Sequence, residues 1–233
     1  MVAAVHATPP AAAPIVWVQA GHEGPREPGY RAQTGAGSGP FGTEVGFTTR
    51  LASRVVVRLR AAGVDARRTP GRVAPLGSRG AVFISLHHDA EGGRAGIGHA
   101  ITGAGENWYH GEGFGTPSPR PYADSAPHRA PTTVTAAVER RSRDLANRLA
   151  ATIGPLRARS EGADGAFGGV EARDGNVRMM RFYGFYRTRA AARVLLEAGA
   201  PGVDDGFLRR VDPIAVAVSA AITRHLRGRG LLR

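Results

Sequence analysis

Short apolar runs that each lead into a metal-binding or ionisable side chain organise this sequence. They are residues 15–19, which lead to His22, residues 82–86, which lead to His87, and residues 193–196, which lead to Glu197. Apolar runs of this length predict buried strands of an α/β sheet. In such sheets, ligands bind at the carboxyl ends of the strands. The pattern therefore predicts one sheet edge at which two imidazoles and a carboxylate meet.

The sequence also predicts helices between and after these strands. Thr43 is a suitable N-cap for a helix that begins at Glu44, and Gly63 is a suitable C-cap. Apolar residues recur at helical spacing between them, at Val45, Leu51, Val55 and Leu59. A short strand over residues 64–68, a helix over 135–153 and a final helix over 213–226 are expected to complete the domain.

In other segments the apolar residues recur at no regular spacing. Residues 1–14 are rich in Ala and Pro and lack the features of a signal peptide, so we expect a flexible leader. Residues 15–233 are expected to form one catalytic domain with a long Gly/Pro-rich insertion at about 91–131. Residues 154–174 form a second loose stretch. Histidines in the insertion are expected to face solvent; they are His99, His110 and His128.

Composition limits the chemistry. The chain has 233 residues, of which 42% are hydrophobic, so it can bury a core, and it contains no apolar run long enough to span a membrane. It has no cysteine, which excludes disulfides and thiolate metal sites. A metal ion in this protein must therefore bind to His, Asp or Glu.

The net charge of +12 comes from arginine alone, because the chain contains no lysine. Such a surface attracts polyanions, among them nucleic acids and anionic cell-wall polymers. The arginines are scattered, apart from those in the tail at residues 224–229, and scattered charge is typical of a solvated surface. We therefore expect no nucleic-acid partner, and we retain anionic wall polymers as candidate partners.

A hydrolytic zinc ion binds three protein ligands and leaves one position for water. His22 and His87 offer neutral nitrogen donors, and Glu44 offers a carboxylate at the positive end of a helix dipole. Glu197 would act as general base and then general acid. An acidic residue at a helix start is, however, also common without any function.

Residues close to these have two interpretations each. Asp89 could orient a ligand imidazole or could stabilise a turn. His88 should point away from His87 along the strand, as an outer-shell or a surface residue.

The order of these elements resembles a known family. An apolar strand leads to Ala-Gly-His22-x-Gly, Glu44 opens a helix, Ile-Ser-Leu precedes His87, and Leu-Leu-Glu197-Ala-Gly follows. This succession resembles the zinc-dependent N-acetylmuramoyl-L-alanine amidases of the Amidase_3 type, which include bacterial cell-wall amidases and phage endolysins. The resemblance covers roughly residues 15–226.

The resemblance implies a single α/β domain with a twisted, mixed, mostly parallel sheet and helices on both faces. It implies one Zn²⁺ per chain, bound by His22, Glu44 and His87, with Glu197 as the catalytic glutamate. The reaction would be hydrolysis of the amide between N-acetylmuramic acid and L-alanine in peptidoglycan or muropeptides. Gln19 stands where the family usually has an acidic residue or Asn. Arg79 corresponds to an arginine that the family has before its second histidine, so it is a candidate for the outer shell of the site.

Other functions remain open at this point. A zinc amidohydrolase that acts on a small acyl-amino acid or peptide would use the same residues, and a non-catalytic wall-binding module would need none of them. A metallocarboxypeptidase is disfavoured because its His-x-x-Glu pair is absent. We expect a monomer that acts at the cell envelope or outside the cell, or that stays in the cytoplasm until release if it is a phage lysin.

Overall fold

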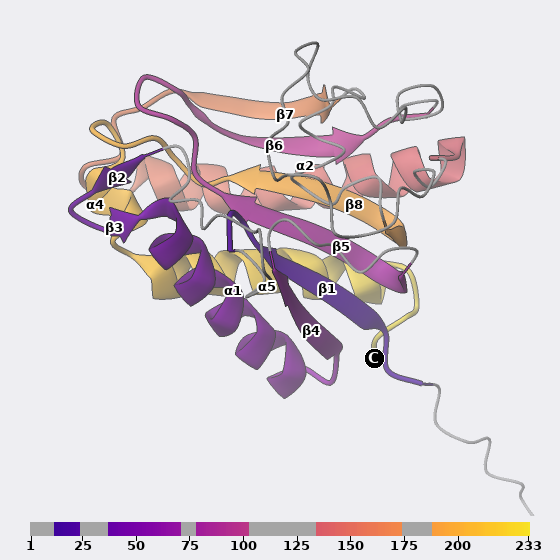
Figure 1. Cartoon of the computed structure of the whole chain (residues 1–233). Helices are drawn as coiled ribbons and strands as arrows, with labels where there is room; N and C mark the ends of the chain where they lie inside the picture. Colours follow the sequence, from indigo (N-terminus) through magenta and orange to yellow (C-terminus); the bar gives the residue numbers. More distant parts are fainter. Residues whose placement is uncertain (1–11, 24–36, 71–77, 103–133, 174–187) are drawn as a thin grey trace, which may run out of the picture.

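The computed structural model describes residues 12–23, 37–70, 78–102, 134–173 and 188–233. These residues form a six-stranded sheet in the order β4-β1-β5-β8-β6-β7, together with a two-stranded ribbon, β2-β3 (Figure 1). Residues 1–11 of the predicted leader lie outside the described ranges.

The centre of the sheet consists of the three strands that the apolar runs predict. β1 (Ile15–Ala20) pairs in parallel with β4 (Asp65–Pro70) on one side and with β5 (Arg79–His87) on the other. β5 pairs in parallel with β8 (Arg189–Glu197). The carboxyl ends of these strands therefore share one edge of the sheet.

The remaining strands of this sheet run in the opposite direction. β6 (Ala95–Ala100) is antiparallel to β8, and β7 (Phe167–Arg173) is parallel to β6. The sheet is therefore mixed and mostly parallel, as expected, and the amino end of β6 lies at the same edge as the carboxyl end of β8.

Helices begin and end close to where the sequence predicts. α1 (Glu44–Ala61) has Thr43 as its N-cap, and α2 (Ala136–Ala158) has Thr135. α5 (Val211–Gly228) follows the single-turn helix α4 (Asp205–Leu208). The ribbon strands β2 (Ser38–Gly39) and β3 (Gly42–Thr43) directly precede α1.

Alternate side chains of the sheet enter one large core. On β5, Val82, Ile84 and Leu86 pack in the same cluster as the buried residues of α1, α2 and α5. α5 contacts both other long helices, and in Figure 1 α2 and α5 run behind the sheet. These helices therefore cover the same face. The other face, for which helices were also expected, carries within the described residues a smaller cluster around Phe83 and Leu195.

Two strands of the six-stranded sheet were missed in the sequence. The range predicted as an insertion from residue 91 contains β6, whose six residues are all buried. His99 on β6 is 5% exposed, so the prediction that it faces solvent was wrong. The stretch predicted as loose from residue 154 contains the end of α2 and all of β7. His110 and His128 lie outside the described residues.

None of the helices in the described part of the chain has the length and apolarity needed to cross a bilayer.

Candidate metal centre

Three predicted ligands meet at the edge where β1 and β5 end. His22 lies in the turn after β1, Glu44 is the first residue of α1, and His87 is the last residue of β5. The carboxylate lies between the two rings: Glu44 Oε1 is 2.9 Å from His87 Nδ1, and Oε2 is 3.5 Å from His22 Nε2. The two imidazoles meet edge to face, with ring centroids 4.9 Å apart.

A glycine makes this approach possible. The Gly21 N–H donates to the carbonyl of Leu86 at 2.9 Å, which continues the β1–β5 pairing up to the turn. A Cβ atom on Gly21 would lie 2.3 Å from Cε1 of His87, so the imidazole fills the space of a side chain. The next residue, His22, has a φ of 58°, a left-handed conformation that is uncommon outside glycine and clusters at functional sites.

The first turn of α1 places the carboxylate. The Thr43 hydroxyl accepts a hydrogen bond from the Gly46 N–H at 3.1 Å, which fixes the start of the helix at Glu44. One turn later, the buried Thr48 hydroxyl donates to the Gly21 carbonyl at 2.7 Å. The same helix therefore supplies one candidate ligand and ties down the turn that carries another.

Burial defines the electrostatics of the cluster. Glu44 is fully buried and His87 is 2% exposed, whereas His22 is 17% exposed. Glu44 Oε1 also accepts a hydrogen bond from the backbone N–H of His88 at 3.3 Å. A buried carboxylate is costly unless positive groups surround it. The helix N-terminus supplies part of that compensation, and a bound cation would supply more.

The donor set fits a zinc ion. One ligand atom from each of the three residues can be chosen so that all lie within 4.8 Å of one another. Two ligands on a tetrahedral zinc ion lie roughly 3.3–3.6 Å apart, so small side-chain movements reach that spacing. Two imidazoles and one carboxylate leave a fourth position open, which is the composition of hydrolytic zinc sites.

Glu197 lies beside this cluster. It is the register partner of His87 in the parallel β5–β8 pair, so both side chains project from the same face of the sheet. Two further hydrogen bonds fix this register beyond the strands: Ala198 N–H donates to the His87 carbonyl at 2.9 Å, and Asp89 N–H donates to the Gly199 carbonyl at 2.8 Å. Glu197 is 8% exposed.

The structure decides between the interpretations of the residues near the ligands. Asp89 accepts hydrogen bonds from the N–H groups of Ala90 and Arg94, at 2.8 and 3.0 Å, so it stabilises a turn. Arg79 lies at the amino end of β5, at the opposite edge of the sheet from His87.

His88 is buried rather than at the surface. It is 1% exposed, and its ring packs edge to face on Phe41 with centroids 5.1 Å apart. Its contact with the cluster is the backbone hydrogen bond to Glu44.

Sequence reasoning missed the polar residues behind His87. Its Nε2 lies 3.0 Å from the Ser85 hydroxyl oxygen, and that hydroxyl donates to Gln19 Oε1 at 2.5 Å. A signal was present, because Ser85 precedes His87 by two residues in a strand and therefore shares its face.

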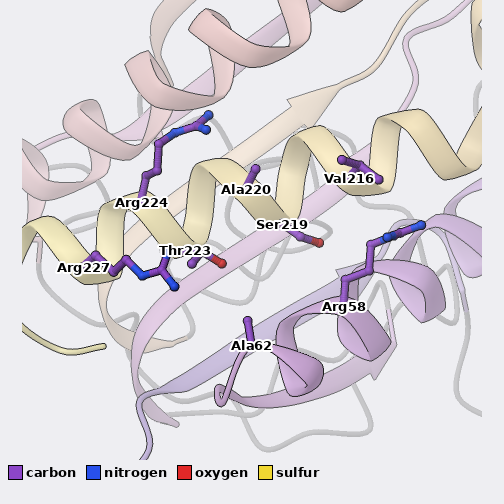
Figure 2. A pocket seen from close by; sticks show the side chains of 8 residues that line it. All are labelled: Arg58, Ala62, Val216, Ser219, Ala220, Thr223, Arg224 and Arg227. Atoms are coloured by element: carbon purple, nitrogen blue, oxygen red, sulfur yellow. The ribbon is translucent and has the colours of Figure 1, made fainter. Parts of the chain in front are cut away.

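A separate cavity lies away from this edge, in the groove between α1 and α5 (Figure 2). Its volume is about 330 Å³. Arginine side chains from both helices line it, among them Arg58 and Arg227. It contains none of the candidate ligands.

No protein-family model and no curated protein sequence matches the chain. Solved structures do match. The N-acetylmuramyl-L-alanine amidase Ami1 from Mycobacterium smegmatis is 18% identical with a TM-score of 0.55, over 93% of this chain and 99% of that one. The N-acetylmuramoyl-L-alanine amidase AmiC2 of Nostoc punctiforme is 17% identical with a TM-score of 0.51, over 91% and 97%.

Cwp6 from Clostridium difficile is 14% identical with a TM-score of 0.55. The match covers 93% of this chain but only 30% of Cwp6, so it corresponds to a part of that longer protein. These likenesses confirm the fold that the sequence resemblance implied: a single α/β domain with the architecture of the N-acetylmuramoyl-L-alanine amidases.

Proposed function

We propose that this protein is a zinc-dependent amidase that cleaves the bond between N-acetylmuramic acid and L-alanine in peptidoglycan. The observation that carries the proposal is the convergence of His22, Glu44 and His87 at one sheet edge, next to Glu197. The fold supports the substrate class, because two solved structures with this architecture are amidases of that name.

The roles of the residues follow from their positions. His22, Glu44 and His87 would hold the ion, which when bound supplies Lewis-acid activation of water and of the amide carbonyl. The ligands come from two strand ends and one helix start, so rigid elements fix their spacing. The partial exposure of His22 indicates the side from which substrate reaches the cluster.

Glu197 would move the proton. Its carboxylate accepts a proton from the attacking water as the C–O bond forms, and donates it to the L-alanine nitrogen as the C–N bond breaks. It sits on the strand next to His87 but outside the trio of candidate ligands. A peptidoglycan substrate would place the protein's action at the cell envelope.

The test is the Glu197→Gln variant, assayed on purified cell walls by the release of L-alanine amino termini. We expect hydrolysis to fall by about 10²–10⁴-fold, the usual contribution of general acid–base catalysis, with one zinc ion per chain retained. Glu171→Gln is the matched control, because Glu171 pairs with Arg94 and lies on β7, which β6 separates from the strands of His87 and Glu197. Its activity should equal that of the wild type.

Other outcomes would contradict the proposal. Full activity of Glu197→Gln would exclude the proposed proton transfer. Hydrolysis of soluble acyl-amino acids without any hydrolysis of walls would replace the substrate class. Stoichiometric wall binding without product would favour a binding module.

A further inference from the structure

Behind His87, the buried polar side chains of Ser85 and Gln19 form a line that leads away from the cluster. Ser85 and Gln19 are register partners on β5 and β1, and each is fully buried. The Ser85 hydroxyl lies between Gln19 Oε1 at 2.5 Å and His87 Nε2 at 3.0 Å. Polar groups in the middle of a packed sheet are costly unless they satisfy one another, so this line requires a reason beyond core packing.

The orientation of the Gln19 amide decides the arrangement of protons along this line. A serine hydroxyl has a single proton, and here Ser85 donates it to Gln19 Oε1. Ser85 Oγ must therefore accept a hydrogen bond from His87, which places the ring proton on Nε2. In the neutral imidazole that metal binding requires, the other ring nitrogen, Nδ1, then presents its lone pair toward Glu44 Oε1, 2.9 Å away.

We propose that Ser85 and Gln19 form a hydrogen-bond relay that positions His87 for metal binding through Nδ1. The relay holds the proton on Nε2 and fixes the plane of the ring, so that a lone pair points to the space shared with Glu44 and His22. A lone pair and a carboxylate oxygen 2.9 Å apart repel each other, and a metal ion bound by both atoms would offset that repulsion. The inference rests on the proposed metal site, and Ser85 and Gln19 are positioning residues in it.

Gln19 sets the direction of the relay. Its carbonyl oxygen accepts the Ser85 proton, whereas its amide nitrogen, if turned toward Ser85, would reverse every hydrogen bond in the line. A carboxylate at this position can only accept, so Gln19→Glu should preserve the direction that we propose. A methionine at this position can neither accept this proton strongly nor donate one.

The test is zinc affinity, measured by competition with a chromophoric chelator on the full chain. We expect Ser85→Ala and Gln19→Met to weaken zinc binding by about 10–100-fold, the usual effect of losing the partner of a ligand histidine. Gln19→Glu should keep wild-type affinity. Ser142→Ala is the matched control: Ser142 is also fully buried and accepts a hydrogen bond from the Arg193 N–H at 2.9 Å, but it lies on α2. The zinc affinity of the Ser142→Ala variant should equal that of the wild type.

A spectroscopic readout is independent of whether the variants fold. Long-range ¹H–¹⁵N correlation spectra of the zinc-loaded wild type should show His87 protonated at Nε2. A proton on Nδ1 would overturn the relay, as would wild-type zinc affinity in both Ser85→Ala and Gln19→Met. Either result would leave the proposed amidase function intact, whereas a wild-type protein that binds no zinc would overturn both.

Discussion

At the scale of single residues, the candidate metal centre needs a glycine at position 21 as much as it needs its three candidate ligands. The imidazole of His87 occupies the volume that a Cβ atom on Gly21 would need. The chain then turns through the left-handed conformation of His22, and the Thr48 hydroxyl holds the Gly21 carbonyl. The two imidazoles can therefore face the same carboxylate from neighbouring strands.

We expect Gly21→Ala to weaken zinc binding on the order of 10–100-fold while the protein stays folded, because the added methyl group displaces the His87 ring. Chelator competition and circular dichroism would measure the two effects. Gly154→Ala is the matched control, since a Cβ there meets the Phe167 ring at 3.4 Å, an ordinary contact. Wild-type zinc affinity in Gly21→Ala would show that the ring does not need this space.

The candidate ligands and Glu197 were predictable at this scale because each interrupts a regular pattern. His22, His87 and Glu197 follow apolar runs, and Glu44 follows an N-cap. The contact between Ser85 and Gln19 could not be predicted from the sequence, because it depends on the register between β1 and β5. The role of Asp89 stayed open, and Arg79 was misplaced, for the same reason: a position in the chain does not say which edge of the sheet, or which turn, a residue occupies.

At the scale of elements, α1 and α2 begin in the same way but serve different ends. In each helix a threonine hydroxyl accepts a backbone N–H three residues on: Thr43 from Gly46 at 3.1 Å, and Thr135 from Val138 at 3.3 Å. Only α1 has a candidate ligand as its first residue. Fraying of the first turn should therefore weaken metal binding when it occurs in α1 but not when it occurs in α2.

We expect Thr43→Ala and Thr135→Ala to lower the free energy of unfolding by similar amounts, about 1 kcal/mol each. Zinc affinity should fall in Thr43→Ala and remain unchanged in Thr135→Ala, since the lost cap releases the backbone that carries Glu44. Urea unfolding and zinc titration of both variants give the comparison. Equal zinc affinities would mean that packing, and not the cap, holds Glu44 in place.

Strands and helices were predictable where large apolar side chains recur at a regular spacing along the chain. β6 was not, because its sequence, Ala-Gly-Ile-Gly-His-Ala, has one β-branched residue and two glycines. It is a strand because β8 and β7 supply hydrogen-bond partners on both sides. Tertiary context decides such weak segments.

At the scale of the whole molecule, a buried ion pair ties α2 to the segment that follows β8. Asp204 is fully buried and pairs with Arg157, which is 5% exposed. Asp204 also accepts hydrogen bonds from the Ala200 N–H at 2.8 Å and from the Gly165 N–H at 3.1 Å. The pair and its hydrogen bonds thus join three parts of the chain: α2, the turn at Gly165 and the segment that follows β8.

We expect Arg157→Met to lower the free energy of unfolding by about 3–5 kcal/mol, because it leaves the Asp204 carboxylate buried without its cation. Arg94→Met, which breaks the more exposed pair with Glu171, should cost at most about 1 kcal/mol. Urea unfolding of both variants makes the comparison. Similar losses in the two would show that burial does not govern the strength of these pairs.

The reversed direction of β6 has a consequence for how this domain could be extended. Because β6 runs antiparallel to β8, its last residue lies toward the edge farthest from Glu197. There, the N–H and hydroxyl of Thr102 donate to the Glu139 carboxylate at 2.9 and 2.6 Å, in the first turn of α2. The end of β6 and the start of α2 are thus joined by hydrogen bonds at the edge of the sheet opposite Glu197. Inserting or removing residues between these two elements should therefore leave the spacing of the candidate ligands unchanged.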